Sequence, residues 1–178
     1  MVTRLLVCAY MAVARLAELA LSKRNLAAGG TATETHVSRA TYPFIIGVHA
    51  LAIAGTLLSG HKRSKPWLLL LLAVQPVRAW VLLTLGRRWN ARGAVSAGTK
   101  VETGGPYAFV RHPNYAVVML ELLALPMAFR APKLALIVTA LNAALLTVRI
   151  HEEEAALMTL PGYARHFAGK KRFIPRLF

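Results

Sequence analysis

The chain has 178 residues, 56% of them hydrophobic, and its 22 Lys and Arg against 7 Asp and Glu leave a formal net charge of +15. An average globular chain is about 45–50% apolar and about one quarter charged. With 16% charged residues, this chain has too little polar surface for a soluble domain. Its basic residues stand in short clusters between apolar runs, which disfavours nucleic-acid binding and indicates a membrane protein with basic loops. Cys8 is the only cysteine, which excludes an intramolecular disulfide and a cysteine-based zinc site, and we predict no metal site.

Five apolar runs are long enough to cross the hydrocarbon core as helices, which takes roughly 17 to 25 residues. They predict an all-α integral membrane protein with one domain, residues 1–178, and a C-terminal helix and tail at 151–178. Arg15 and Glu18 interrupt the first run, so we expect no cleaved signal peptide. The predicted transmembrane helices are residues 2–21, 42–59, 66–85, 114–129 and 131–150.

The last two runs are separated only by Arg130, Ala131 and Pro132, which predicts a tight antiparallel hairpin, with Pro126 bending the end of the fourth helix. Lys and Arg in the loops predict the orientation. Fourteen of the 22 lie in loop 22–40, loop 86–112 and the tail from residue 149, and six lie in the opposite connections. The positive-inside rule therefore places the third loop and the tail in the cytoplasm and the N-terminus outside the cell membrane.

The third loop ends with Gly104-Gly105-Pro106, a chain reversal. Pro113 follows where the fourth helix begins, and its missing N–H costs nothing in a first helical turn. The free N–H groups of that turn would point to the cytoplasm. An ordinary turn and helix cap is an equally good interpretation of this segment.

Directly after the fifth apolar run, Arg149 and Glu153 stand at positions i and i+4, so they can pair on one helix face. Three of the seven acidic residues crowd into positions 152–154. A solvated helix end is the plainer interpretation for Glu152 and Glu154. It fits Glu153 less well, because that residue is spaced to face an arginine at the membrane surface.

These motifs, taken together, resemble the isoprenylcysteine carboxyl methyltransferases, which are integral membrane enzymes that use S-adenosylmethionine. The resemblance is dense from about residue 99 to 175. It extends to an N-terminal half similar to a bacterial subgroup often paired with type III polyketide synthases, through Arg15, Glu18-Leu19, Ser22, Arg24-Asn25, Tyr42-Pro43 and His49. One departure is Val117, where the family usually has glycine. The C-terminal motifs are Gly105-Pro106-Tyr107, Arg111-His112-Pro113-Asn114-Tyr115, Arg149-Ile150 with Glu153-Glu154, Gly162-Tyr163 and Lys171-Arg172-Phe173-Ile174-Pro175.

The resemblance implies roles for individual residues. Glu153 would contact the methionyl ammonium of the cofactor, and Arg149 would face the reacting oxygen of the substrate. Two further groups would hold the rest of the cofactor. Thr99, Lys100, Val101, Glu102 and Tyr107 would line its adenosyl part, and His112, Pro113, Asn114 and Tyr115 would hold it at the helix start.

The chemistry of these residue types agrees with those roles. A zwitterionic sulfonium needs an anion for its ammonium (Glu153), a donor for its carboxylate (Arg111 or the helix N-terminus) and a shelf for adenine (Tyr107 or Tyr115). Methyl transfer is a displacement that gains most from holding an oxygen against the methyl group in a dry site. An ionised carboxylate needs no base. A phenol or hydroxypyrone can need one, and His112, His151 and Glu153 are the candidates.

One polar residue in each predicted span lies about six to nine residues from its cytoplasmic end, roughly 9 to 14 Å at about 1.5 Å per residue. Ionisable groups inside a membrane usually face the bundle interior or a cavity. We expect Arg78 to pair with Glu121, and the layer to form the floor of a cavity for the polar head of a lipophilic substrate. Contacts between helices with no substrate role are the structural alternative. The layer consists of Arg15, His49, Arg78, Glu121 and Asn142.

The resemblance, together with the predicted topology, thus implies an S-adenosylmethionine-dependent O-methyltransferase with a cytoplasmic site formed by the third loop, the start of the fourth helix and the C-terminal helix. The expected acceptor is a prenylcysteine carboxylate or a long-chain polyketide phenol or pyrone that enters from the membrane lipids. The alternatives are a phospholipid N-methyltransferase and a non-enzymatic membrane scaffold or small transporter. Five spans without repeats disfavour a transporter.

Overall fold

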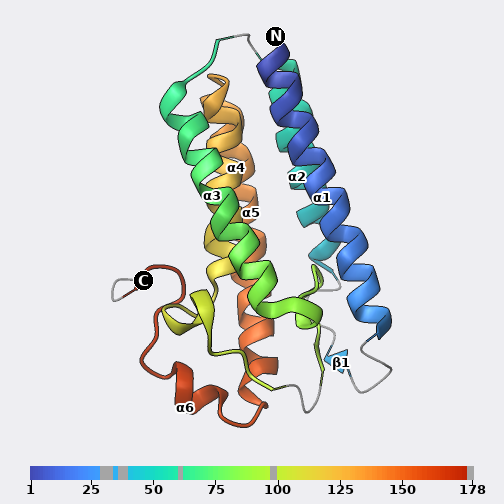
Figure 1. Cartoon of the computed structure of the whole chain (residues 1–178), viewed down its shortest axis with the longest axis vertical. Coiled ribbons are helices and arrows are strands. Elements are labelled where there is room, and N and C mark those ends of the chain that lie inside the picture. Colours follow the sequence, from blue (N-terminus) through green and yellow to red (C-terminus); the bar gives the residue numbers. More distant parts are fainter. Residues whose placement is uncertain (29–33, 36–39, 60–61, 97–99, 176–178) are drawn as a thin grey trace.

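The computed structural model describes residues 1–28, 34–35, 40–59, 62–96 and 100–175, and this part of the chain is mostly helical. Its long helices run side by side along the long axis (Figure 1). Short helices occupy Gly86–Arg88 (η1), Gly105–Ala108 (η2) and Tyr163–Phe167 (α6). The long helices are α1 (Val2–Ala28), α2 (Tyr42–Leu58), α3 (Lys65–Leu85), α4 (Pro113–Ala128) and α5 (Pro132–Met158).

Three helical segments are long and apolar enough to cross a membrane, namely α1, α3 with the adjoining η1, and α5. Helices α2 and α4 are apolar but shorter. Many apolar side chains point outward, and Leu58 and Leu83 are 88% and 81% exposed. Exposed apolar surface of this extent is typical of contact with lipid. The prediction of five apolar helices is confirmed, whereas the number that spans the bilayer stays a prediction.

Prolines begin four of the long helices, at Pro43, Pro66, Pro113 and Pro132. A proline in a first helical turn forfeits no hydrogen bond and has a helical φ already set. The predicted hairpin between α4 and α5 is confirmed. The backbone N–H of Ala131 donates to the carbonyl of Pro126 (3.0 Å), and Arg130 has a φ of 60°.

Two helices extend further than hydropathy predicts. α1 continues to Ala28 and α5 to Met158, so residues 151–158 continue the fifth helix instead of starting a separate one. No proline or glycine interrupts the sequence between Pro132 and Pro161, and backbone hydrogen bonding does not stop where the apolar side chains stop. The separate helix α6 comes only after the turn at Pro161-Gly162. The acidic residues 152–154 therefore lie on α5 itself.

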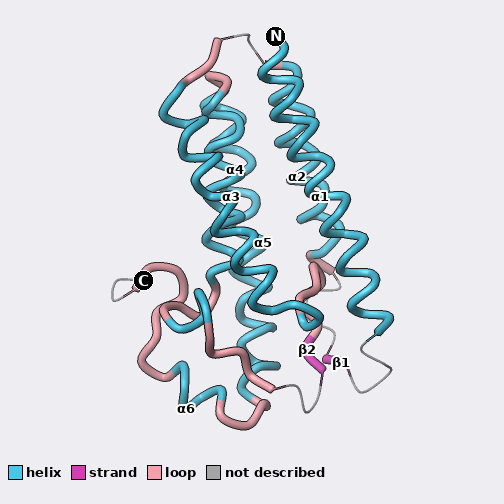
Figure 2. The backbone as a smooth tube through the Cα atoms, viewed as in Figure 1, coloured by secondary structure: helices cyan, strands magenta, loops and turns pink. Residues whose placement is uncertain are grey.

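A two-residue antiparallel ribbon was not predicted from the sequence. It joins β1 (Glu34–Thr35) to β2 (Val95–Ser96), with Glu34 opposite Ser96 and Thr35 opposite Val95. Figure 2 shows the ribbon at the end of the bundle away from the N-terminus, the end that also carries α6. The ribbon therefore ties the connection between α1 and α2 to the third loop, at the end where the motifs lie.

Candidate functional site

Buried polar side chains of α1 hold the first part of the third loop. Asn25 Nδ2 donates to the carbonyl oxygens of Trp89 (2.7 Å) and Gly86 (3.2 Å). Ser22 Oγ accepts a hydrogen bond from the Ala91 backbone N–H (2.9 Å). Ser22 and Asn25 are both buried. Residues 86–91 of the loop are thus held against the end of α1.

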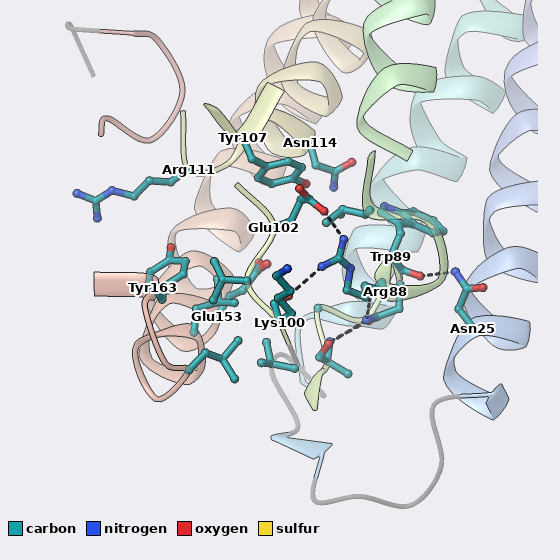
Figure 3. Close-up of a pocket in the computed structure, with 18 of the residues that line it drawn as sticks. Asn25, Arg88, Trp89, Lys100, Glu102, Tyr107, Arg111, Asn114, Glu153 and Tyr163 are labelled. Carbon is teal, nitrogen blue, oxygen red and sulfur yellow. Dashed lines mark hydrogen bonds and ion pairs between the residues drawn. The ribbon is translucent and has the colours of Figure 1, made fainter. Parts of the chain in front are cut away.

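Under this loop lies a cavity of about 390 Å³, the loop cavity, between the third loop, the start of α4, the last turns of α5 and α6. Figure 3 shows Glu102, Tyr107 and Asn114 on one side of it and Glu153 and Tyr163 on another. Many of its lining residues belong to the cofactor site predicted from the sequence. Those that line it are Lys100, Val101, Glu102, Tyr107, Arg111, Asn114, Tyr115 and Glu153.

Arg149, Tyr115 and Glu153 form a hydrogen-bonded cluster in the wall of the loop cavity. Arg149 Nε donates to the Tyr115 hydroxyl (2.8 Å), and that hydroxyl donates to Glu153 Oε2. Arg149 Nη2 also donates to the carbonyl oxygen of Ala91 (2.6 Å). Arg149 and Glu153 therefore share a helix face as predicted, but the phenol of Tyr115 stands between them.

Glu154 anchors the C-terminal tail, a role that its interpretation as a solvated helix end did not anticipate. Its carboxylate accepts from Arg172 (2.7 and 3.1 Å), contacts His112 Nε2 at 3.0 Å and lies 3.5 Å from Arg111. The backbone N–H groups of Arg111 and His112 donate to the carbonyls of Lys171 and Arg172 (2.9 Å each). These bonds clamp the tail against the start of α4, and so fix the position of Tyr115.

Several predicted cofactor residues take other positions. His112 is buried and bonded to Glu154, and neither it nor Pro113 is among the residues that line the loop cavity. Arg111 borders the loop cavity, but its Nε donates to the carbonyl of Lys170 (2.7 Å) and Figure 3 shows its guanidinium turned away. His151 is exposed and contacts the carbonyl oxygen of its own helix at Thr147. Thr99 lies outside the described residues.

Arg88, Trp89 and Tyr163 line the loop cavity and were not predicted. Arg88 contacts the Glu102 carboxylate and donates to the Lys100 carbonyl (2.9 Å), so it shapes the predicted adenosyl segment (Figure 3). Nothing in the run Arg87-Arg88-Trp89 distinguishes one arginine from the other. The Gly162-Tyr163 motif belongs to the family resemblance, but that resemblance implied no role for Tyr163.

The protonation states around the loop cavity follow from these contacts. Burial raises the pKa of Glu102, but the Gly104 N–H, Arg88 and the Thr103 N–H outweigh it, so the pKa falls below its usual value. Burial and the nearby Glu153 raise the pKa of the Tyr107 phenol well above its usual value. The cavity therefore presents a carboxylate beside a phenol that keeps its proton.

A second cavity of about 400 Å³, the bundle cavity, lies between the α1–α2 pair and helices α3, α4 and α5. It is mostly apolar, with isoleucines and leucines of α1, α2 and α5 in its wall. The predicted polar layer supplies four of its lining residues, while Glu121 stands behind the wall. The four are Arg15, His49, Arg78 and Asn142.

The predicted pair between Arg78 and Glu121 is wrong. Arg78 instead bonds Glu18 twice (2.7 and 2.9 Å) and donates to Asn114 Oδ1 (2.6 Å). Glu121 accepts from Gln75 (3.0 Å) and from Arg15 (3.4 Å), and Arg15 also bonds Glu18 (3.0 Å). A long arginine side chain can reach residues above or below its own backbone along the helix axis. The position of Arg78 along α3 therefore did not determine which carboxylate it contacts.

The two cavities share a wall. The side chains that line both of them are Trp89, Asn114, Tyr115 and Arg149. Three of these came from the predicted motifs, and Arg78 holds Asn114 in place. A molecule in the loop cavity and one in the bundle cavity would therefore meet at the Arg149–Tyr115 pair.

The fold and this pair of cavities define an α-helical membrane protein with one cavity at the end of the bundle and a second, less polar cavity beside it. A family model described as "Isoprenylcysteine carboxyl methyltransferase (ICMT) family" matches residues 67–159, just over half of the chain. The chain is also 37% identical over 159 residues to "Uncharacterized protein YpbQ" of Bacillus subtilis (strain 168), covering 85% of this chain and 95% of that protein. The chain therefore belongs to the isoprenylcysteine carboxyl methyltransferase family, which implies a membrane methyltransferase.

The family match confirms the resemblance, and the matched range includes the residues of the wall shared by the two cavities. Residues 67–159 contain most of α3, all of α4 and the third loop, and α5 to its end, including Tyr115, Arg149 and Glu153. Helices α1 and α2, which supply much of the bundle cavity, lie outside the match. The kinship to the subgroup paired with polyketide synthases stays a prediction.

Proposed function

We propose that this protein is an S-adenosylmethionine-dependent O-methyltransferase that binds its cofactor in the loop cavity and a lipophilic acceptor in the bundle cavity. The observation that carries the proposal is the shared wall. A transfer between two molecules requires their reacting atoms to meet in a fixed orientation. The two cavities differ in polarity and meet at Arg149 and Tyr115.

The loop cavity fits the cofactor. Its volume lies in the range of about 300–1,000 Å³ of small-molecule sites, and Glu102 and Glu153 supply anions for an ammonium group. Two of its buried lining residues, Trp89 and Tyr163, have a polar atom without a hydrogen-bond partner in the described structure. Buried polar atoms normally have partners, so these atoms support a polar ligand. S-adenosylmethionine, when bound, supplies a methyl group carried on a sulfonium.

Arg149 favours an oxygen acceptor over a nitrogen acceptor. Its guanidinium is buried in the shared wall and already donates to Tyr115 and Ala91. A fixed cation stabilises a carboxylate or phenolate, whereas it repels an amine that gains positive charge on methylation. This argues against the phospholipid N-methyltransferase alternative, and the acceptor is a lipophilic carboxylic acid, phenol or hydroxypyrone.

A phenol acceptor gives Glu153 a second role. Of the three general-base candidates, Glu153 lines the loop cavity and is hydrogen-bonded to Tyr115, which lines both cavities. His112 is held by Glu154, and His151 is exposed on the outer face of α5. For such an acceptor, the proposal assigns the general base to Glu153, which takes the proton through the Tyr115 hydroxyl.

The charge distribution supports a multi-pass protein of the cell membrane with the loop cavity on the cytoplasmic side. Fourteen of the 22 Lys and Arg belong to residues 22–40, which include the last turns of α1, to the third loop and to the chain from residue 149. The last turns of α1, the last turns of α5 and α6 lie at the end opposite the N-terminus (Figure 1). The partners are then membrane lipids and the lipophilic acceptor, with the N-terminus outside.

Titration of the detergent-solubilised protein with S-adenosylhomocysteine tests the proposal by calorimetry. We expect binding, and we expect Glu153→Gln to weaken it roughly ten- to hundredfold, because a charge-assisted hydrogen bond contributes about 1.5–3 kcal/mol. Glu152→Gln is the matched control, because Glu152 is exposed on the same turn and lines neither cavity. A wild-type protein that binds no S-adenosylhomocysteine at any accessible concentration would refute the proposal.

Gly93 tests whether the position of Arg149 matters. Gly93 is buried with a φ of 69°, and an added Cβ would lie 3.1 Å from Arg149 Nη2. We expect Gly93→Ala to lower turnover on the order of tenfold by displacing the guanidinium. Gly86→Ala is the control, because Gly86 has a φ of 52° and no atom within 4 Å of its added Cβ. Equal losses in both variants would assign the effect to backbone strain alone.

A further inference from the structure

The bundle cavity has two polar levels. α2 contributes Tyr42 at the loop end and His49 seven residues further on, while α5 contributes Arg149 and, seven residues earlier, Asn142. Val48, next to His49, belongs to one hydrophobic cluster with Val138 and Leu145 of α5, which flank Asn142, so His49 and Asn142 lie at one level. Seven residues of helix span about 10 Å. His49 and Asn142 therefore form a second polar level about 10 Å deeper than the Arg149–Tyr115 pair.

Apolar side chains line the cavity on both sides of this deeper level. Ile45 and Ile46 of α2 and Leu146 of α5 lie between the two polar levels. Ile53 and Leu57 of α2 lie beyond His49, so the cavity continues past the polar layer. The expectation that the layer forms the floor of the cavity is therefore wrong. Polar and apolar zones alternate along the cavity instead.

The two walls of the deeper level differ in their hydrogen bonding. On the α1–α3–α4 side, two arginines and two glutamates bond one another, so their charges balance. On the α2–α5 side, Asn142 is fully buried, its Nδ2 donates to Met119 Sδ (3.2 Å), and its Oδ1 has no partner in the described structure. No hydrogen bond within the described residues involves His49, which is half-buried. The balanced set is Arg15, Glu18, Arg78 and Glu121.

Asn142 Oδ1 is a buried polar atom without a partner among the described residues, which is unfavourable. The half-buried His49 lines the same level of the cavity from the facing helix and makes no hydrogen bond with the described residues. Together they indicate that a ligand in the cavity supplies the missing partners. Because the charged residues there neutralise one another, an ionised group would find no counter-charge. A neutral hydroxyl meets both requirements, because it can donate to the free Asn142 Oδ1 and can also form a hydrogen bond with the imidazole of His49.

We infer that the bundle cavity takes an acceptor whose hydrocarbon chain carries a second, neutral hydrogen-bonding group about 10 Å from the methyl-accepting atom. His49 and Asn142 bind that group, and hydrocarbon fills the zones on either side of it. This inference rests on the proposed function, because that function determines which end of the acceptor is methylated. It makes a plain hydrocarbon-tailed lipid a poorer ligand than a chain-hydroxylated one.

The test uses two pairs of long-chain probes, one pair with a phenol head and one with a carboxylate head. Within each pair, one member has an unsubstituted chain and the other a hydroxyl about 10 Å from the head oxygen. Affinity for the full-length protein in nanodiscs is measured by ligand-dependent thermal stabilisation without cofactor. We expect the hydroxylated member of at least one pair to bind about three- to tenfold more tightly, the range of one net hydrogen bond.

His49→Leu and Asn142→Leu are each expected to abolish this preference and to leave the affinity for the plain probe within about twofold. Thr139→Val is the matched control, because Thr139 Oγ1 on α5 also has no partner among the described residues but lines neither cavity. If a leucine variant does not fold, Asn142→Ser replaces it, since it shortens the side chain and keeps the site polar.

Equal affinity of the two members of both pairs, absence of binding by all four probes, or a preference that survives both leucine variants would each overturn the inference. The proposed function fails separately, through the absence of S-adenosylhomocysteine binding. A preference for the hydroxylated probe in a protein that does not bind S-adenosylhomocysteine would keep the cavity assignment and remove the methyltransferase assignment.

Discussion

Replacing Arg149 by lysine is expected to lower turnover by about two to three orders of magnitude, the usual loss when a fixed donor to a reacting oxygen is removed. Arg149 is buried, and its fork donates from Nε to Tyr115 and from Nη2 to Ala91. A lysine keeps the charge but is a single-point donor without the planar fork. It cannot hold both contacts and still face the acceptor.

Initial rates at saturating cofactor and acceptor measure this change. Calorimetry with S-adenosylhomocysteine measures the cofactor-site affinity, which we expect to stay within about threefold of the wild-type value, less than the effect of one net hydrogen bond. Arg165→Lys, at an exposed position in α6, is the control. If Arg149→Lys raises only the KM for the acceptor and leaves kcat unchanged, Arg149 binds the acceptor without acting on the reacting oxygen.

The lining of the loop cavity could be predicted in large part because its residues belong to contiguous motifs. Tyr107, Asn114 and Tyr115 lie close together in the sequence, and the i, i+4 spacing places Arg149 and Glu153 on one face of α5. The position of each helix followed from hydropathy, since burial in lipid requires runs of apolar residues. These are local properties, and the sequence carries them directly.

Contacts between distant segments were not predictable in the same way. Arg15, Arg78, Glu18 and Glu121 were all recognisable as intramembrane charges, but their pairing depends on the rotation of each helix and on the reach of the arginines. Hydropathy carries no information about helix rotation among equally apolar faces. The shared position of these charged residues along the bundle was therefore predicted correctly, whereas the partner of Arg78 was predicted incorrectly.

Glu154 shows a second reason why some contacts could not be predicted from the sequence. A carboxylate at the end of an apolar helix is normally solvated, and only the returning tail converts it into an anchor for His112 and Arg172. The tail and α4 are far apart in the sequence, so no spacing rule connects them. The same holds for Asn25, which reaches the carbonyl of Trp89 across 64 positions.

The network around Arg78 leads to the second large effect. Arg78→Leu is expected to lower the free energy of unfolding by about 3–5 kcal/mol, because it leaves a buried carboxylate uncompensated. Glu18 loses both of its bonds to Arg78, and Arg15 alone then faces Glu18 and Glu121. Denaturation in mixed detergent micelles measures the change, with the exposed Arg63→Leu as the control, for which less than about 1 kcal/mol is expected.

The double variant Arg78→Leu with Glu18→Gln separates stability from function. Removing both charges restores a balanced pair of Arg15 and Glu121, so most of the lost stability should return. Turnover should stay low, because Asn114 has still lost the donor that positions it in the wall between the two cavities. If stability and turnover recover together, the network is only structural. If stability returns without turnover, Arg78 is a positioning residue, acting through Asn114 on the place where cofactor and acceptor meet.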